Sequence, residues 1–156
     1  MQAVSNDMLR NRVTEIMTEA PIDTIERGLT VAFAANVMKE RARGSLVVVD
    51  SGKPVGIITE RDLVRRVIAE TRSPSATKVG DIMSESLISI GPEATVSSAA
   101  NVMYKNGVRR LPVIEGGRLL GIVTSTDLAR AMQRESEKDD VLLAMTRFKM
   151  IEELNK

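Results

Sequence analysis

The chain of 156 residues contains no cysteine, no histidine and no tryptophan, and its aromatic residues are one tyrosine and two phenylalanines. The absence of cysteine and histidine excludes thiol nucleophiles, disulfides, histidine-based catalytic triads and the usual Cys/His zinc sites. It also leaves no side chain whose ordinary pKa lies near neutrality. Because 43% of the residues are hydrophobic, we expect a buried core, and it must be built from aliphatic side chains.

Charge and hydropathy exclude further classes of protein. The formal net charge is +1, both signs are mixed along the chain, and so few aromatics cannot supply base-stacking platforms. Nucleic acid is therefore not an expected partner. No apolar run approaches the roughly 20 residues that cross a bilayer, and the first residues do not resemble a signal peptide. We expect a cytoplasmic protein that contacts no membrane.

The most informative feature present is an internal repeat. Residues 30–65 are written again at 95–130, with nearly half of the aligned positions identical. A shorter repeated segment precedes each copy, at 13–19 and 79–85. Two copies of so short a unit predict two halves that complete one core and are related by a pseudo-two-fold axis.

The first copy is predicted to read strand, helix, strand, strand, helix. Hydrophobic spacing and turn residues predict strands at 22–25, 45–50 and 54–59 and helices at 31–43 and 60–69. Thr30 is suited to the N-cap of the first helix, and Gly44 is expected to end it.

The second copy repeats this order. We expect strands at 87–90, 110–115 and 119–124, and helices at 96–105 and 125–134. The equivalent residues Asn36 and Asn101 are expected to be buried or half-buried hydrogen bonders in the first helix of each copy.

The segments outside the repeats are expected to be helical. Residues 7–17 have a helical pattern, and 139–154 predict an amphipathic helix that completes the core or a dimer contact. Its apolar side consists of Val141, Leu142, Met145, Phe148 and Ile151. The predicted organisation is an N-terminal segment 1–12, a first repeat 13–70, a linker 71–78, a second repeat 79–134 and a C-terminal helix 135–156.

A Thr-x-x-Asp pattern begins the late helix of both copies, as Thr59 with Asp62 and Thr124 with Asp127. One interpretation is a capping box, in which threonine and the acid satisfy free backbone N–H groups at the helix start. The other is a ligand site, because an aspartate there can accept from two adjacent hydroxyls of a ribose while threonine and amides contact phosphate. The two roles are compatible.

In these motifs the chain resembles a tandem pair of cystathionine β-synthase (CBS) domains, a Bateman module. The resemblance runs from about residue 13 to residue 132. It rests on the Ile-Met-Thr and Ile-Met-Ser openings, on the stretch from Gly107 to Ile114, and on the duplicated Gly-Ile-hydrophobic-Thr-x-x-Asp-Leu motif. It implies an α/β (α+β) fold of two βαββα repeats packed sheet to sheet, with flanking helices.

The resemblance also implies ligands and site residues. Clefts between the repeats would bind AMP, ADP or ATP, with S-adenosylmethionine or NAD as further adenosine-containing candidates. Asp62 with Thr59 would mark one cleft, and Asp127 with Thr124 the other. Walls around the base would come from residues near the first and second strands, namely Ile22, Val47, Ile88 and Pro112.

The two copies differ in charge beside these motifs. Arg109 and Arg110 stand where the first copy has Gly44 and Ser45, and the family often places cations there against phosphate. We therefore expect one cleft with a phosphate clamp and a weaker second one. Arg61 is a further candidate phosphate contact, and the alternative for all three arginines is a solvated surface position.

Three functions follow as hypotheses. The leading one is a stand-alone regulatory module for energy sensing, a homodimer built through the late helices that reports nucleotide binding to an unidentified effector protein. The alternative is a structural interaction or dimerisation module with vestigial clefts. An enzyme is not expected, because acid–base chemistry would fall to Asp, Glu, Lys and the single Tyr104, in a helix predicted to pack. No metal and no required cofactor are expected.

Overall fold

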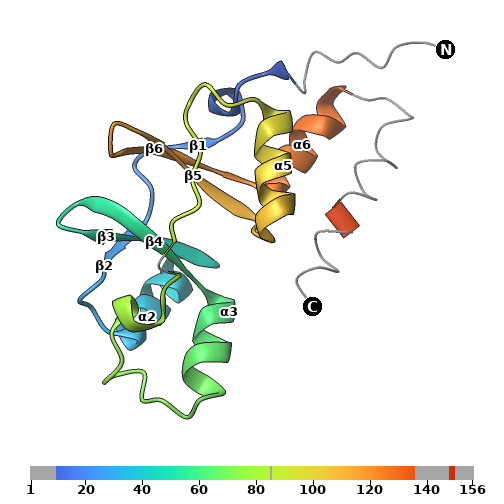
Figure 1. The fold of residues 1–156 in the computed structure, drawn as a ribbon. Helices are drawn as coiled ribbons and strands as arrows, with labels where there is room; N and C mark the ends of the chain where they lie inside the picture. The colour runs from blue at the N-terminus through green and yellow to red at the C-terminus, as the bar shows by residue number, and fades with distance from the viewer. Residues whose placement is uncertain (1–9, 85, 136–147, 150–156) are drawn as a thin grey trace. The chain divides into compact units, whose positions relative to one another are not determined.

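A computed structural model describes residues 10–84, 86–135 and 148–149. The chain divides into two compact units (Figure 1). Unit 2 is the continuous stretch Ile22–Leu87, whereas unit 1 combines Met1–Pro21 with Ile88–Lys156. Each unit contains one three-stranded sheet with helices, so the predicted mixed α/β class is confirmed.

Unit 2 is built around a sheet of strand order β2-β3-β4. Strand β2 runs parallel to β3, and β3 and β4 form an antiparallel hairpin. The hairpin turns at Ser51 and Gly52, both with positive φ, as a tight turn between twisted strands requires. The elements of this unit are β2 (Thr24–Glu26), α2 (Val31–Arg41), β3 (Ser45–Asp50), β4 (Lys53–Thr59), α3 (Glu60–Leu63), the π-helical segment η2 (Val64–Ile68) and α4 (Val79–Ile82).

Unit 1 also contains a three-stranded sheet, of order β1-β6-β5, but its third strand lies on the other edge of the hairpin, beside the second hairpin strand. Strands β5 and β6 form the hairpin, and β1 pairs antiparallel with β6. Helices α5 and α6 contact each other beside this sheet (Figure 1). The elements are the 3₁₀ turn η1 (Val13–Glu15), β1 (Thr18–Glu19), α5 (Val96–Asn106), β5 (Arg110–Glu115), β6 (Arg118–Thr124) and α6 (Ser125–Glu135).

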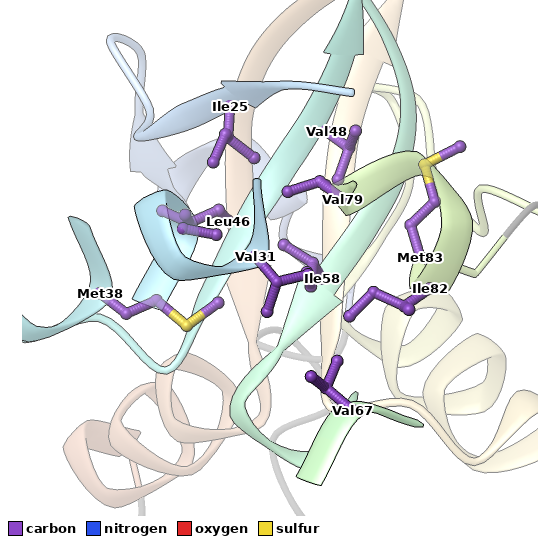
Figure 2. Close-up of a cluster of buried hydrophobic side chains, with 11 residues drawn as sticks. Ile25, Val31, Met38, Leu46, Val48, Ile58, Val67, Val79, Ile82 and Met83 are labelled. Atoms are coloured by element: carbon purple, nitrogen blue, oxygen red, sulfur yellow. The ribbon is translucent and has the colours of Figure 1, made fainter. Parts of the chain in front are cut away.

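Each unit has its own aliphatic core. Figure 2 shows the core of unit 2, where Leu46 and Val48 of β3 belong to one cluster with side chains of α2, α4 and η2. The core of unit 1 is built from the equivalent helices and strands, with Met103, Leu111 and Val123 fully buried. Because neither core contains an aromatic side chain among its buried residues, its stability comes from dense packing of methyl and methylene groups.

Each repeat is preceded by a short opening segment, which begins at Val13 for the first repeat and at Val79 for the second. Each opening segment packs with the other repeat and not with the one that follows it in sequence. Val13 belongs to the core of unit 1, with the strands of the second repeat. Val79, Ile82 and Met83 belong to the core of unit 2, with the strands of the first repeat. Each unit therefore needs the opening segment that precedes the other repeat in the chain.

Several predicted elements differ in detail from the structure. Helix α2 ends at Arg41, and Ala42, two residues before Gly44, takes the left-handed C-cap conformation. The predicted strand at 87–90 is reduced to an isolated bridge between Ile90 and Val113. Asn36 and Asn101 are exposed, because each lies on the outer side of its helix, so their predicted burial is wrong.

The predictions for the ends of the chain are tested only in part. Within 10–17 the structure has the short turn η1 in place of a continuous helix. Most of the predicted helix at 139–154 lies outside the described residues, although Phe148 is helical and packs against the core of unit 1. Across the part of the chain that the structure describes, no helix has the length and apolar character needed to cross a bilayer.

Candidate functional site

The Thr-x-x-Asp turn of unit 2 is held by a reciprocal set of hydrogen bonds where β4 passes into α3. Oδ2 of Asp62 accepts from the backbone N–H of Thr59 at 2.8 Å and from its hydroxyl at 3.0 Å. In return, the Thr59 hydroxyl oxygen accepts from the N–H of Asp62 at 3.2 Å. This is a capping box, so the predicted structural role is confirmed at this turn.

The turn of unit 1 has the same bonds where β6 passes into α6. Oδ2 of Asp127 accepts from the N–H and from the hydroxyl of Thr124, each at 2.8 Å. The N–H of Asp127 donates to the Thr124 hydroxyl oxygen at 3.2 Å. Both predicted pairs are thus brought together, and in both the hydrogen bonds from threonine use only Oδ2 of the carboxylate.

The first residues of the neighbouring strand lie directly beside each turn. Ser45 pairs with Thr59 in unit 2, and Arg110 pairs with Thr124 in unit 1. The N–H of Ser125 donates to the carbonyl of Arg109 at 2.9 Å. The predicted difference in charge between the two copies therefore lies directly beside the turns, since unit 1 has two arginines where unit 2 has Gly44 and Ser45.

The three candidate arginines have different surroundings. Arg109 is half-buried, and its Nε is shielded from solvent without a hydrogen-bond partner in the described residues. Such an unsatisfied donor is costly unless another group accepts from it. Arg110 is also half-buried, whereas Arg61 is exposed on α3. Of the three, Arg109 is the one whose environment calls for an additional acceptor.

The predicted wall residues lie on adjacent segments within each unit. In unit 2, Ile22 lies two residues before β2, and Thr24 of β2 pairs with Val47, which is buried. Val47 is absent from the cluster that contains its neighbours Leu46 and Val48, as expected for a residue on the opposite face of the sheet.

Unit 1 repeats this arrangement. Pro112 is buried in β5, and its carbonyl accepts from the N–H of Ile90 at 3.0 Å. Ile88, two residues earlier, is partly buried against the unit 1 core. The wall residues thus occupy equivalent places in both units, and their contact with a ligand stays a prediction.

An ion cluster lies next to Ile22. Asp23 accepts from Arg41 and, at 2.9 Å, from Nε of Arg43. The hydrogen bond from Arg41, together with that from Arg43 and the positive charge of both, lowers the pKa of Asp23 against the opposing effect of burial. This carboxylate is therefore ionised and neutralised by its own chain near the start of β2.

One neighbour of the turns was missed by sequence reasoning. Nε of Arg66 lies 3.7 Å from Oδ1 of Asp62, an i,i+4 pair on one helical turn. The i,i+4 spacing is visible in the sequence, but Arg61 was the only cation considered there beside the acid of the first copy. No cluster of three or more acidic residues that could hold a metal is found among the described residues.

Comparison with known proteins agrees with this architecture. The family model of the CBS domain matches residues 13–69 and 79–134. The CBS domain-containing protein CBSX3, mitochondrial, of Arabidopsis thaliana is 41% identical over 115 residues, which are 70% of this chain. This chain spans 56% of the length of CBSX3 and 62% of that of a second curated relative.

Solved structures show the same fold. A putative signal-transduction protein with CBS domains from Burkholderia ambifaria superposes with a TM-score of 0.75 at 30% identity, covering 83% of this chain and 98% of that one. A hexameric CBS-CP12 protein from bloom-forming cyanobacteria superposes with a TM-score of 0.70 at 29% identity, covering 94% and 95%. With two matched domains over most of its length, this chain belongs to the CBS-domain family and carries a tandem pair of CBS domains.

Proposed function

We propose that this chain is a regulatory module that binds an adenosine-containing nucleotide, AMP, ADP or ATP, at its Thr-x-x-Asp turns. The observation that carries the proposal is the geometry of the two acids. Each aspartate is fixed by its threonine through one oxygen, so the carboxylate is oriented before a ligand arrives. A preorganised group loses little conformational freedom on binding, which favours affinity.

The chemistry of the second carboxylate oxygen suits a ribose diol. An ionised carboxylate only accepts hydrogen bonds, and its two oxygens offer about four acceptor positions. At Asp127 both bonds from Thr124 use Oδ2, and no other donor to this side chain is found within the described residues. Two adjacent ribose hydroxyls could therefore donate to Oδ1. Adenosine, S-adenosylmethionine and NAD share this diol. The turn alone would therefore recognise adenosine-containing ligands as a class without distinguishing one from another.

Unit 1 is the better candidate for a phosphorylated ligand. Arg109 and Arg110 begin β5 beside Thr124, and the buried Nε of Arg109 has no partner in the described chain. A guanidinium pairs with phosphate through charge-assisted hydrogen bonds. We therefore propose that the site of unit 1 binds the nucleotide more tightly and that the site of unit 2 is weaker.

Calorimetric titration tests this function. The wild type and the variants Asp62→Asn and Asp127→Asn would be titrated with AMP, ATP and S-adenosylmethionine. Saturable binding that is weakened in Asp127→Asn, and less so in Asp62→Asn, would support the proposal. No heat with any of these ligands would reject it, and binding of equal strength at both sites would remove the asymmetry.

The output of the module is proposed to pass through protein contacts. A ligand changes an assembly only through different affinities for its alternative arrangements. In unit 2 the late helical segment exposes Val64 and Ile68, with 58% and 62% of their surfaces accessible. The cyanobacterial CBS-CP12 relative is a hexamer. We propose that this chain forms a homodimer in which η2 takes part and that an effector protein reads the arrangement.

The second candidate function is an interaction module without a ligand. The complete capping box at Thr59 and Asp62 favours it, because this geometry already explains the acid structurally. On this hypothesis Asp62→Asn and Asp127→Asn would lower stability and change nothing else. The titration described above distinguishes the two functions.

A further inference from the structure

The two acids differ on the side that faces away from threonine. In unit 2 the guanidinium of Arg66 is held beside Asp62, with its Nε 3.7 Å from Oδ1. Its Nη1 donates to the backbone carbonyl of Ile82 at 2.7 Å and to that of Met83 at 3.3 Å. The side chain is thus fixed at three points although it is about half exposed. The equivalent residue in the unit 1 repeat is Ala131, which has no charge.

A local change in the helix explains why an arginine is accommodated at this position. Ala131 is 7% exposed in the α-helix α6, so a regular helix directs this position into the core. In unit 2 the helix widens into the π-helical segment η2, closed by the bond from Ala69 N–H to the Val64 carbonyl at 2.8 Å. The widening shifts the helical phase by one residue, so Val67 is buried at 1% exposure and Arg66 turns outward. Such π-turns often mark functional positions.

We propose that Arg66 is a specificity-determining residue of the unit 2 site, an inference that rests on the proposed nucleotide binding. Its positive charge lies beside the carboxylate oxygen that a ribose diol would use. A cation there reduces the negative potential that attracts hydroxyl donors and narrows the approach to Oδ1. The unit 2 site therefore binds the diol of an adenine nucleotide more weakly than it would without Arg66. Asp127, which has no such neighbour among the described residues, remains fully available.

The test isolates the unit 2 site and asks about the diol alone. In a background of Asp127→Asn, which weakens the unit 1 site, the added variants are Arg66→Ala, Arg66→Gln and Arg65→Ala. Arg65→Ala is the matched control, because it removes the same charge from the neighbouring helical position, whereas the ion pair with Asp62 is formed by Arg66. Arg66→Gln keeps a donor for the two carbonyls and covers the case in which Arg66→Ala fails to fold. Each protein is titrated calorimetrically with AMP and with 2′-deoxy-AMP.

We expect both Arg66 variants to bind AMP about threefold to fivefold more tightly than the background, the size of a partly exposed ion pair. Binding of 2′-deoxy-AMP, which lacks one hydroxyl of the diol, should change less. The proposal is overturned if AMP affinity is unchanged or reduced, if 2′-deoxy-AMP gains equally, or if Arg65→Ala gives the same increase. If one of these results is found while the wild-type protein binds AMP, the role of Arg66 is rejected and the proposed nucleotide binding stands. If the wild-type protein binds no nucleotide, both the role of Arg66 and the proposed function are rejected.

Discussion

Thr124 donates two hydrogen bonds to one oxygen of Asp127, from its backbone N–H and from its hydroxyl, each 2.8 Å long. The same residue pair therefore stabilises the start of α6 and fixes the orientation of the acid on which the proposed ligand site depends. Because the proposed ligand would use the other carboxylate oxygen, substitutions can separate the structural role from the proposed one.

Replacing Asp127 with alanine should lower the free energy of unfolding by about 1 kcal/mol, the usual cost of losing a side-chain cap at a helix start. Asparagine retains an acceptor oxygen and should lose less. Urea denaturation followed by circular dichroism measures both variants against wild type. If Asp127→Ala is as stable as wild type, the hydrogen bonds to Thr124 do not contribute to folding.

Removing the side chain of Arg109 should weaken binding of ATP by about tenfold or more, because a hydrogen bond to a charged group contributes about 1.5–3 kcal/mol. Binding of adenosine, which has no phosphate, should change little. Calorimetry of Arg109→Ala with both ligands tests this. Arg118→Ala is the control, since Arg118 lies at the opposite end of the same hairpin and is exposed. An equal loss for adenosine would show that Arg109 does not act on phosphate.

The glycine of the Gly-Ile motif in β6 should not tolerate a methyl group. A Cβ at Gly121 would lie 2.5 Å from the backbone carbonyl oxygen of Thr18 and 2.7 Å from Sδ of Met17. Relieving this overlap means shifting the backbone of β1, so Gly121→Ala should cost about 1–3 kcal/mol of stability, measured by thermal or urea unfolding. Gly91→Ala is the control, because its Cβ would meet nothing within 4 Å. Equal stability of the two variants would contradict the packing of β1 on β6.

Placing a charge at Ile68 should reduce self-association if the exposed face of η2 is part of a dimer contact. Burying an unpaired carboxylate in an apolar interface is unfavourable, so Ile68→Glu should shift the protein toward monomer. Sedimentation velocity at several concentrations measures this shift. Gln133→Glu tests the equivalent, exposed position of α6 in unit 1. An unchanged dimer in Ile68→Glu would place the contact elsewhere.

Stability at acidic pH should depend on Asp23. Its pKa is lowered in the folded state, chiefly by the hydrogen bond from Arg41. A lowered folded-state pKa means that the stabilisation is present above the ordinary value of 3.8 and is lost as the pH falls through the folded-state value. The difference in stability between wild type and Asp23→Asn should therefore be largest near neutral pH and shrink below about pH 4. A difference that is independent of pH between 2 and 7 would contradict this.

The sequence predicted the elements that are specified locally. Strand β3 has the predicted bounds because a run of β-branched residues is closed by a Gly-containing turn, and β5 follows the same pattern. The Thr-x-x-Asp pairs could be predicted because all their bonds join residues three positions apart. Local pattern was therefore sufficient for both turns.

Features that depend on distant residues were missed. Strand β1 has two residues, and its pairing with Ile122 and Gly121 leaves no periodic pattern in the sequence. The outward position of Arg66 depends on a π-turn, which shifts the helical phase so that Val67 is buried in place of Arg66. Likewise, nothing in the sequence indicated that Nε of Arg109 is shielded from solvent without a hydrogen-bond partner in the described residues.

The exchange of opening segments has a consequence for how the protein is made. Unit 2 is one continuous stretch, so all of its core residues have been synthesised by the time Met83 is added. Val13, by contrast, belongs to a core whose last buried residue among those described is Leu128, with Phe148 packed against it. We expect unit 2 to fold first on the ribosome, before the rest of unit 1 has been synthesised. The residues around Val13 then pack with the remainder of unit 1, which closes a long loop at a modest entropic cost. The residues around Val13, although they precede all of unit 2 in the chain, are thus among the last to reach their native contacts.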